Sequence, residues 1–348
     1  MRSEGGLDKR KAYILATVVY EYIATAEPVG SNTLTQKYNL GVSSATVRNE
    51  MAELEAGGYL VQPHTSAGRV PSDTGYRTYV DELMQPETLA PEDRRRIRDD
   101  LREASRELDD LLESATRLVG RLSNNLAFVT KPQPDTQTFK HIQLIWLSPR
   151  TGVAIVVTSL GVAAQSVFEV SSDLDADALT RLSNALNARL SNRLMRDIPE
   201  SDVQAAVEEL GLADELRGAV LAAMRSARSA QAPSIAAAGA QNLLDQPEFQ
   251  DLRKLRSILR IVEEQKTLYE MVADAIGNET PVVKIGSELG VEELADLSVV
   301  TVPYRFGKNA IGMLSILGPR RMPYGRLVAL ASGTADTLSE RLSDVEIK

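Results

Sequence analysis

One short stretch of the chain carries four side-chain groups that read base edges in DNA. A methyl, a hydroxyl, a guanidinium and an amide follow one another within two predicted helical turns, contributed by Ala45, Thr46, Arg48 and Asn49. In the major groove a guanidinium suits guanine, an amide suits adenine and a methyl suits thymine. Ser43 and Ser44 stand at the start of the same helix, where free backbone N–H groups suit a phosphate. The stretch is therefore a candidate for direct contact with a duplex.

The surrounding pattern predicts a helix-turn-helix that holds this stretch on its outer face. A helix over 9–24 and a short helix over 32–38, capped by Ser31, are followed by a tight turn at 39–42. Ser43 then caps the third helix, which ends at the glycine pair 57–58. One narrow stripe of that helix should face the core, formed by Val47, Met51 and Leu54.

A β-hairpin is predicted directly after the three helices. Residues 59–62 and 69–71 have the pattern of short strands, and they flank a loop over 63–68. Three helices followed by a hairpin form a winged helix, and Ser72 is expected to cap a closing helix after it. Three residues of the hairpin are candidates for contact with the DNA backbone or the minor groove: His64, Thr65 and Arg69. For His64 an ordinary solvated loop position is an equal alternative.

The same residues also fit a plain helical hairpin, because Ser, Thr, Arg and Asn are common on solvated faces. Glu50, Glu53 and Glu55 place acid on the third helix, so a duplex must meet the N-terminal half of that helix. On physical grounds alone, the pattern favours DNA binding.

The charge of the chain permits DNA binding without arguing for it. The net charge of the 348 residues is −9, yet residues 1–80 hold eight Lys/Arg and eight Asp/Glu and are neutral. The acidic balance therefore lies entirely in the remainder of the chain.

The rest of the sequence predicts an α+β protein. Residues 84–94 have the composition of a linker, and a heptad seam follows in a long charged helix over 92–123. The seam either pairs with a second copy or packs within its own chain, and its two alanines favour the second interpretation. Residues 139–170 predict an antiparallel meander, 173–232 are helical with breaks near Pro199 and Gly211, and 248–276 predict a further helix.

Three further strands are expected over 281–285, 297–304 and 310–317, followed by a last helix over 324–343. Strands, helices and strands again indicate one sheet domain with a helical insertion.

Other classes of function find little support. The chain has no cysteine, and its two histidines, His64 and His141, stand far apart, so we expect no metal site. It contains neither a phosphate-binding glycine pattern nor a nucleophile motif, so we expect no cofactor and no enzyme. The N-terminus lacks a secretion signal and no apolar run is long enough to span a membrane, so we expect a cytoplasmic protein.

Several segments closely resemble the HrcA family of bacterial heat-inducible repressors. The loop motif Pro-His-Thr-Ser-Ala-Gly-Arg is the most specific of them, and residues 173–235 match least well. The matching segments are Glu27–Ser31, Val42–Met51, Leu54–Glu55, Gly58–Leu60, Gln62–Pro71, Gly75–Arg77, Tyr79–Asp81, Asn242–Leu244, Gln246–Phe249, Ile285–Gly286, Leu297–Val300, Gly318–Met322 and Tyr324.

This resemblance implies a multidomain α+β fold. A winged helix-turn-helix would occupy residues 1–85 and a linker 86–96, a GAF-like domain 97–172 and 236–348, and an inserted, largely helical dimerisation domain 173–235. The resemblance also implies a homodimer that binds the inverted-repeat operator CIRCE and represses chaperone operons in the absence of stress. The chaperonin GroEL would keep the repressor competent to bind.

A ligand-sensing regulator that uses a pocket of the GAF-like domain is the main alternative, although no convergent polar cluster in the sequence names a ligand.

Overall fold

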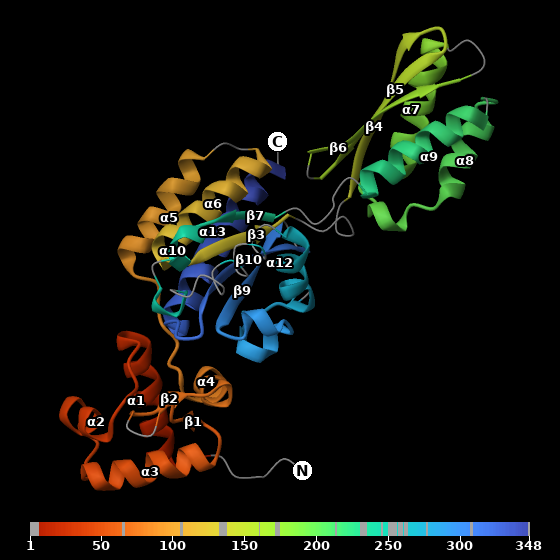
Figure 1. Ribbon diagram of the computed structural model, residues 1–348. Helices are drawn as coiled ribbons and strands as arrows, with labels where there is room; N and C mark the ends of the chain where they lie inside the picture. The colour runs from red at the N-terminus through yellow and green to blue at the C-terminus, as the bar shows by residue number, and fades with distance from the viewer. Residues whose placement is uncertain are drawn as a thin grey trace. The chain divides into compact units, whose positions relative to one another are not determined.

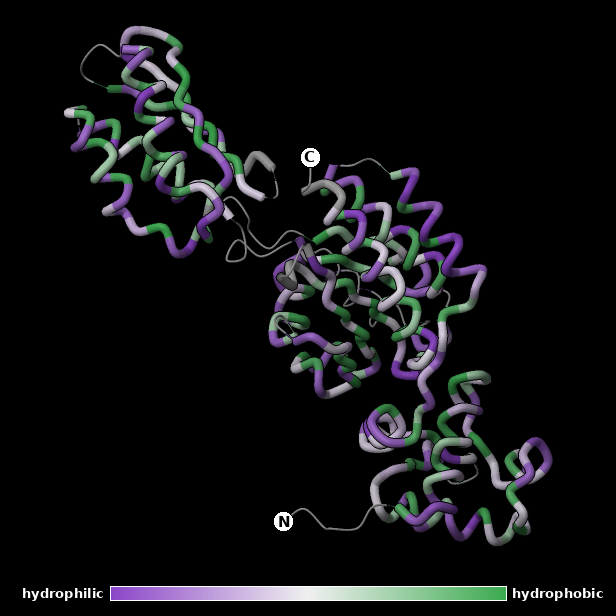
Figure 2. Tube along the Cα trace, turned by 180° about the vertical axis from the view of Figure 1, so that it is seen from behind, coloured by the Kyte–Doolittle hydropathy of each residue, from purple (hydrophilic) through white to green (hydrophobic). Residues whose placement is uncertain are grey.

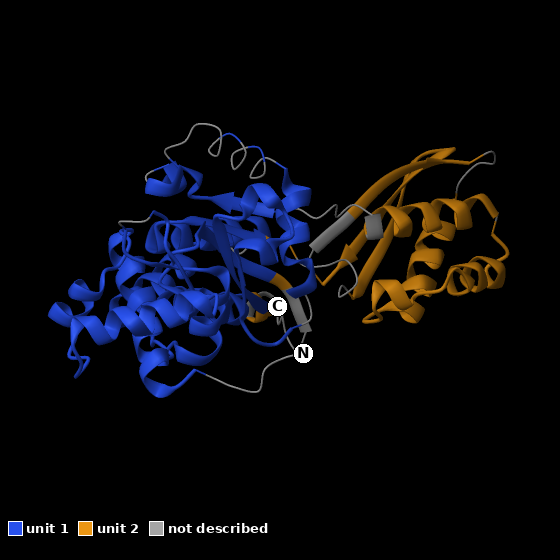
Figure 3. Cartoon of the chain, turned by 60° about the horizontal axis from the view of Figure 1, so that its bottom comes forward, with its two compact units in different colours: residues 1–129, 235–304, 313–341 blue, residues 130–234, 305–312, 342–348 orange. Residues whose placement is uncertain are grey.

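The computed structural model describes most of the chain, and its residues form two compact units (Figure 3). The first unit comprises residues 1–129, 235–304 and 313–341, and the second comprises 130–234, 305–312 and 342–348. Within them the described residues are 7–64, 67–104, 107–131, 138–159, 161–170, 175–212, 214–229, 235–244, 246–249, 256, 260, 264–275, 278–306 and 309–346.

The first unit begins with an N-terminal segment, residues 7–84, of helices and one pair of short strands. Strands β1 and β2 are antiparallel, with Leu60 opposite Pro71. The elements are α1 (Lys9–Thr25), α2 (Ser31–Lys37), α3 (Ser44–Ala56), β1 (Leu60–Val61), β2 (Val70–Pro71), α4 (Asp73–Thr78) and a π-helical turn η1 (Tyr79–Leu83).

Side-chain caps fix where these helices begin. The Ser43 hydroxyl accepts a hydrogen bond from the backbone N–H of Thr46 at 3.2 Å, and the Ser72 hydroxyl accepts one from Gly75 at 3.0 Å, as the sequence predicts. The predicted cap at Ser31 is wrong by one residue: Gly30 is the N-cap of α2, and Ser31 lies buried in its first turn. At the far end of α3, Gly58 has a φ of 80°, a left-handed conformation in which glycine meets no steric penalty.

Gly68 allows the strand pair to lie against the turn after α1. Val29 and Arg69 exchange two backbone hydrogen bonds of 2.9 Å each, which ties the hairpin to this turn. A Cβ at Gly68 would stand 2.5 Å from the carbonyl carbon and oxygen of Val29, closer than side chains can approach a backbone. Only glycine fits at this position.

The second part of the first unit is built on a five-stranded sheet in the order β7-β3-β10-β9-β8. Leu126 and Phe128 of β3 share a core with α12, while the alternating residues Ala127 and Val129 are buried on the opposite face. Figure 1 shows α5, α6 and α13 on that opposite side. The strands are β3 (Leu126–Thr130), β7 (Ile235–Ala238), β8 (Val282–Ile285), β9 (Leu297–Phe306) and β10 (Asn309–Pro319).

The long charged helix expected over 92–123 is two helices. α5 (Pro91–Glu103) ends where Ala104 adopts an extended backbone, and α6 (Leu108–Ser123) begins four residues later. The two helices pack on each other and are joined by a 2.6 Å ion pair between Arg121 and Asp100. The heptad seam therefore serves packing within the chain, which confirms that interpretation. In Figure 2, α5 is drawn mostly as hydrophilic.

Shorter helices and one long helix complete this part. They are α10 (Ala240–Leu244), α12 (Gln265–Val272), α13 (Tyr324–Glu346) and the short 3-10 turns η4 (Pro247–Phe249), η5 (Ala273–Ala275), η6 (Gly286–Leu289) and η7 (Glu292–Leu294). Much of the helix expected over 248–276 lies outside the described residues.

The second unit contains a separate three-stranded sheet, so the single sheet expected from the sequence is wrong. Its order is β4-β5-β6, an antiparallel meander as predicted, and two of the helices that follow it cover one of its faces. The elements are β4 (Phe139–Ser148), β5 (Thr151–Thr158), β6 (Gly161–Glu169), α7 (Ala176–Leu190), η3 (Met195–Asp197), α8 (Glu200–Glu209) and α9 (Asp214–Ser229). Pro199 and Gly211 interrupt the helices where the sequence indicates.

The same core joins strand and helix residues, among them Ile142, Val156 and Phe168 with Leu182 and Val220. Residues 130–172, expected with the GAF-like domain, thus lie in the same compact unit as the helices that follow them. None of the described helices has the length and apolar character needed to cross a membrane.

Replacing Gly68 with alanine should destabilise the N-terminal segment by about 1–3 kcal/mol, because the new Cβ would overlap the Val29 backbone. Gly30→Ala is the matched control, since a Cβ there meets only Thr33 Oγ1 at 3.8 Å. Thermal unfolding followed by circular dichroism measures both. Equal stability of the two variants would contradict the close approach.

Candidate nucleic-acid interface

Helix α3 presents the predicted residues on its outer face. Val47, Met51 and Leu54 are fully buried, as the stripe predicts, while Arg48 and Asn49 are exposed. Within the part of the chain that the structure describes, neither the Arg48 nor the Asn49 side chain forms a hydrogen bond or an ion pair. Ala45 is exposed beside them, and the guanidinium, the amide and the methyl are all open to a ligand.

The hydroxyls at the start of α3 are occupied by the protein itself. Ser43 Oγ caps the helix and lies 3.0 Å from Thr46 Oγ1. Ser44 Oγ lies 3.0 Å from Ser31 Oγ and also donates to Asn32 of α2. These contacts fix the start of α3 against α2. A phosphate at this point would therefore meet the backbone N–H groups of the helix N-terminus, and hydroxyls that already form hydrogen bonds within the protein.

Each acidic residue of α3 is paired with a basic residue outside the helix, a pairing that the sequence did not predict. Arg10 of α1 donates to the buried Glu50 with its Nε at 2.8 Å, and Lys11 Nζ lies 2.8 Å from Glu53. The third acid, Glu55, is held by Arg69. The basic run Lys9-Arg10-Lys11 at the start of α1 was the only signal of this pairing in the sequence. The pairing removes the objection that acid on α3 would repel a duplex.

The hairpin residues predicted to touch DNA lie in different surroundings. Arg69 is largely buried, with a side chain 15% exposed, and its Nε and Nη2 lie 3.0 and 2.9 Å from Glu55 Oε2. Its guanidinium is thus committed to the fold. His64 is exposed in the loop, and its carbonyl accepts a 2.8 Å hydrogen bond from Ala67. Thr65 lies outside the described residues.

A buried carboxylate on α1 holds α2 in place. Glu21 is almost fully buried and accepts hydrogen bonds from Lys37 Nζ and, at 2.8 Å, from Tyr38 Oη. The Lys37 ammonium and then the Tyr38 hydroxyl lower the pKa of Glu21, against the opposing effect of burial. Burial, followed by the hydrogen bond to Glu21, raises the pKa of Tyr38 to about 12. This cluster positions α2, which in turn positions the start of α3.

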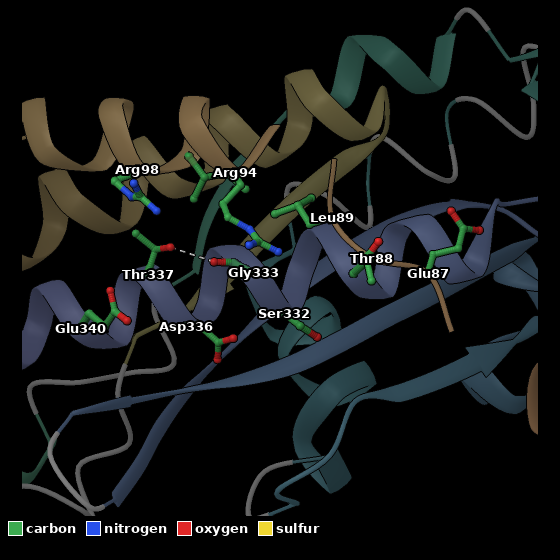
Figure 4. Close-up of a pocket in the computed structure, with 12 residues that line it drawn as sticks. Glu87, Thr88, Leu89, Arg94, Arg98, Ser332, Gly333, Asp336, Thr337 and Glu340 are labelled. Carbon is green, nitrogen blue, oxygen red and sulfur yellow. Dashed lines mark hydrogen bonds between the residues drawn. The ribbon is translucent and has the colours of Figure 1, made fainter. Parts of the chain in front are cut away.

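The described residues also contain a groove away from α3. Its volume is about 410 Å³, and it lies between the linker, α5 and α13. Figure 4 shows Arg94 and Arg98 extending from α5 toward α13, with Leu89 of the linker near Gly333. No group of three or more side chains among the described residues is arranged to hold a metal ion.

Comparison with known proteins gives consistent matches. The family described as HrcA protein C terminal domain matches residues 109–328. A protein from Pelotomaculum thermopropionicum, named heat-inducible transcription repressor HrcA, is 36% identical over 340 residues, 97% of this chain and 98% of its own. A protein of the same name from Symbiobacterium thermophilum is 38% identical over 339 residues, 96% of this chain and 98% of its own.

A solved structure is similar in fold. It is described only as a hypothetical protein at 2.2 Å resolution, and it is 23% identical with a TM-score of 0.60. The match covers 98% of this chain and 100% of that one, so the fold as a whole has been observed before.

The Glu21 cluster predicts a pH-dependent anchoring of α2. Because the pKa of Glu21 is lowered in the folded chain, its contribution is present above the unfolded value, near 4.5, and is lost as the pH falls through the lower folded value. Hydrogen exchange of α2 amides, corrected for intrinsic rates, should therefore rise more steeply in the native chain than in Glu21→Gln once the pH falls below the unfolded value of 4.5. The variant should lose about 1 kcal/mol of protection at pH 7. Parallel pH profiles for the two chains would contradict this role.

Proposed function

The chain belongs to the HrcA family, and on that premise we propose that it is a transcription repressor of heat-shock chaperone operons. It binds the CIRCE inverted repeat as a homodimer in the cytoplasm and is released on heat stress. The observation that carries the proposal is the exposed, unpaired face of α3, with Arg48, Asn49 and Ala45 beside one another. Those three groups suit guanine, adenine and thymine in the major groove.

We assign the N-terminal segment as a winged helix-turn-helix. The order of three helices, a two-stranded antiparallel pair and a fourth helix supports this assignment. α2 and α3 form the helix-turn-helix, and the loop between β1 and β2 forms the wing. In this arrangement α3 enters the major groove and Ser43, Ser44 and Thr46 approach the backbone. The wing residues His64 and Thr65 are assigned to the adjacent backbone, whereas Arg69 acts by holding Glu55.

The homodimer is proposed to form through the second unit. α7 and α9 pack on one face of its sheet, and the other face carries an apolar row in which Ile145, Val153 and Val167 lie opposite one another on β4, β5 and β6. Val167 is 63% exposed and Ile145 is 39% exposed, whereas Val153 between them is only 6% exposed. Exposed apolar side chains gathered on one sheet face are typical of an interface. The boundary we propose for the dimerising domain therefore begins near 130, where the compact unit begins, rather than at 173.

A dimer would place two α3 helices in successive major grooves of the operator, about 10–10.5 bp apart or a multiple of that spacing. The control by GroEL rests on the family resemblance, and the GAF-like assignment of the central sheet rests on it as well.

The base-reading role predicts the behaviour of two variants. Arg48→Ala and Asn49→Ala should each weaken binding by about 1–3 kcal/mol and relax the preference at particular base pairs. Arg102→Ala, which removes an exposed arginine of α5, is the matched control and should bind as the native chain does. Gel shifts on operators with single base changes measure both. A uniform loss over all duplexes would reassign the residue to a phosphate.

The function as a whole is tested by gel shift against a CIRCE duplex and a scrambled duplex, with and without GroEL. Selective binding strengthened by GroEL supports the repressor and its control. Selective binding that is unchanged by GroEL supports the repressor function and indicates that the chain itself responds to heat. No preference for CIRCE under either condition would contradict the operator assignment. It would favour a ligand sensor that uses the groove beside α13.

A further inference from the structure

Helix α4 is fastened to the central sheet part of the first unit by its first residue. Asp73 Oδ1 accepts a 2.7 Å hydrogen bond from Arg320, which also reaches Asp296 at 3.2 Å. Asp73 Oδ2 accepts from the backbone N–H and the hydroxyl of Ser287, at 3.2 and 3.0 Å. Burial opposes its ionisation, yet Arg320 and Ser287 hold the pKa of Asp73 below its usual value. The charged form of Asp73 is therefore the form that the contact selects.

The backbone beside this contact is shaped to receive the carboxylate. Gly286 has a φ of 54°, and a Cβ there would stand 2.6 Å from Asp73 Oδ2. One turn further along α4, Arg77 donates to the carbonyl of Val283 in β8 at 2.9 Å and pairs with Glu288 at 3.3 Å. Both ends of the short helix are thus held by elements more than 200 residues away in the sequence.

An aromatic contact fills the space between the two anchors. Tyr76 of α4 and Tyr324 at the start of α13 are both buried, with ring centroids 6.1 Å apart in an edge-on arrangement. Tyr324 Oη is bound to Ser298 at 2.9 Å, whereas Tyr76 Oη is buried without a hydrogen-bond partner among the described residues. Tyr76 therefore contributes to this contact through the packing of its ring and not through its hydroxyl.

The linker is held by the same long helix. A Cβ at Gly333 of α13 would stand 2.7 Å from Leu89, and one at Gly325 would stand 2.7 Å from Glu87. Figure 4 shows this stretch of the linker running beside α13. The two glycines make room for the linker to lie directly on the helix. The N-terminal segment is therefore attached to the central sheet part at two places, through α4 and through the linker.

We propose that Asp73, Tyr76 and Arg77, with Ser287, Arg320 and Tyr324, form a latch that sets the orientation of the recognition helix and so determines which half-site spacing the dimer accepts. This inference rests on the proposed function. The latch residues are positioning residues: they act through the direction in which α3 is held and touch no base.

The latch should therefore affect the affinity for the full operator, which has two half-sites, but not the affinity for a single half-site. Binding of a single half-site needs only the contacts made by one N-terminal segment, α3 and the wing, so the latch has no effect on it. Binding of two half-sites at once depends on the effective concentration of the second α3 at its groove, and a rigid attachment of matching geometry maximises that concentration. A loosened latch spreads the second helix over many directions and lowers the affinity for the full operator.

The test compares Arg320→Ala and Asp73→Asn with the native dimer, on a half-site duplex and on the full operator. Each variant should bind the full operator about 10-fold or more weakly, with half-site affinity unchanged, and should tolerate spacers that the native chain rejects. The double variant should lose less than the sum of the two single losses, because both substitutions weaken the same Arg320–Asp73 pair. Arg321→Ala is the matched control, because the hydrogen bonds and the ion pair of Arg321 are with Glu248 and Gln246 rather than with α4.

Tyr76→Phe is a second control. It keeps the ring contact and removes a buried hydroxyl without a partner, so full-operator binding should stay unchanged or improve. A full-operator affinity unaltered by Arg320→Ala, or an equal loss on half-site and full operator, would overturn the latch.

A measurement without DNA separates this inference from the proposed function. The chain has no cysteine, so spin labels at Ala56→Cys of α3 and Arg102→Cys of α5 report one distance, with unlabelled chain in excess. The distance distribution should be narrow in the native chain and in Arg321→Ala, and should broaden in Arg320→Ala. If Arg320→Ala broadens the distribution but the native chain does not bind the operator, the latch is supported and the repressor function is contradicted. Identical distance distributions in the native chain and in Arg320→Ala would contradict the latch.

Discussion

The neutralisation of α3 by its neighbours is the constraint on which the proposed interface depends. A helix that meets a polyanion with three glutamates along it would be repelled, and here Arg10, Lys11 and Arg69 hold those glutamates on its other sides. Each ion pair also packs α3 against another element, α1 for two of them and the hairpin for the third. The same contacts therefore fix the helix and clear its outer face, where Arg48 and Asn49 are left unpaired among the described residues.

This arrangement divides the basic residues of the N-terminal segment into two kinds. Arg69 is paired with Glu55 and Lys37 with Glu21, both carboxylates of the fold. Substituting Arg69 would therefore affect DNA binding by displacing α3, and substituting Lys37 by displacing α2. Arg48 has no such partner, and its removal would act on the ligand. A neutral segment can then serve a nucleic acid because the three carboxylates of α3 are paired with cations of the segment, whereas the Arg48 guanidinium remains free where a base would lie.

The two sheets divide the remaining tasks. The five-stranded sheet is covered by helices on both faces, and its loops and α13 receive α4 and the linker. The three-stranded sheet of the second unit is covered on one face by α7 and α9, and its other face carries an apolar row at Ile145, Val153 and Val167. One sheet thus holds the N-terminal segment, and the other is the sheet through which we propose that a second copy pairs.

The sequence by itself determined the local elements and the identity of the candidate face. Caps at Ser43 and Ser72, the stripe at Val47, the meander over 139–170 and the breaks at Pro199 and Gly211 depend on nearby residues, so periodicity and turn chemistry suffice to find them. The tertiary structure alone decided everything that joins distant residues. It split the charged helix at Ala104, separated the strands into two sheets, and added β3 and β7, which the sequence did not predict.

The tertiary structure likewise committed Arg69 to Glu55 and brought Arg320 to Asp73, 247 residues away. A charged side chain in a sequence gives no sign of whether it will meet a carboxylate of the fold or remain free for a ligand, because that choice is made by packing between segments far apart in the chain.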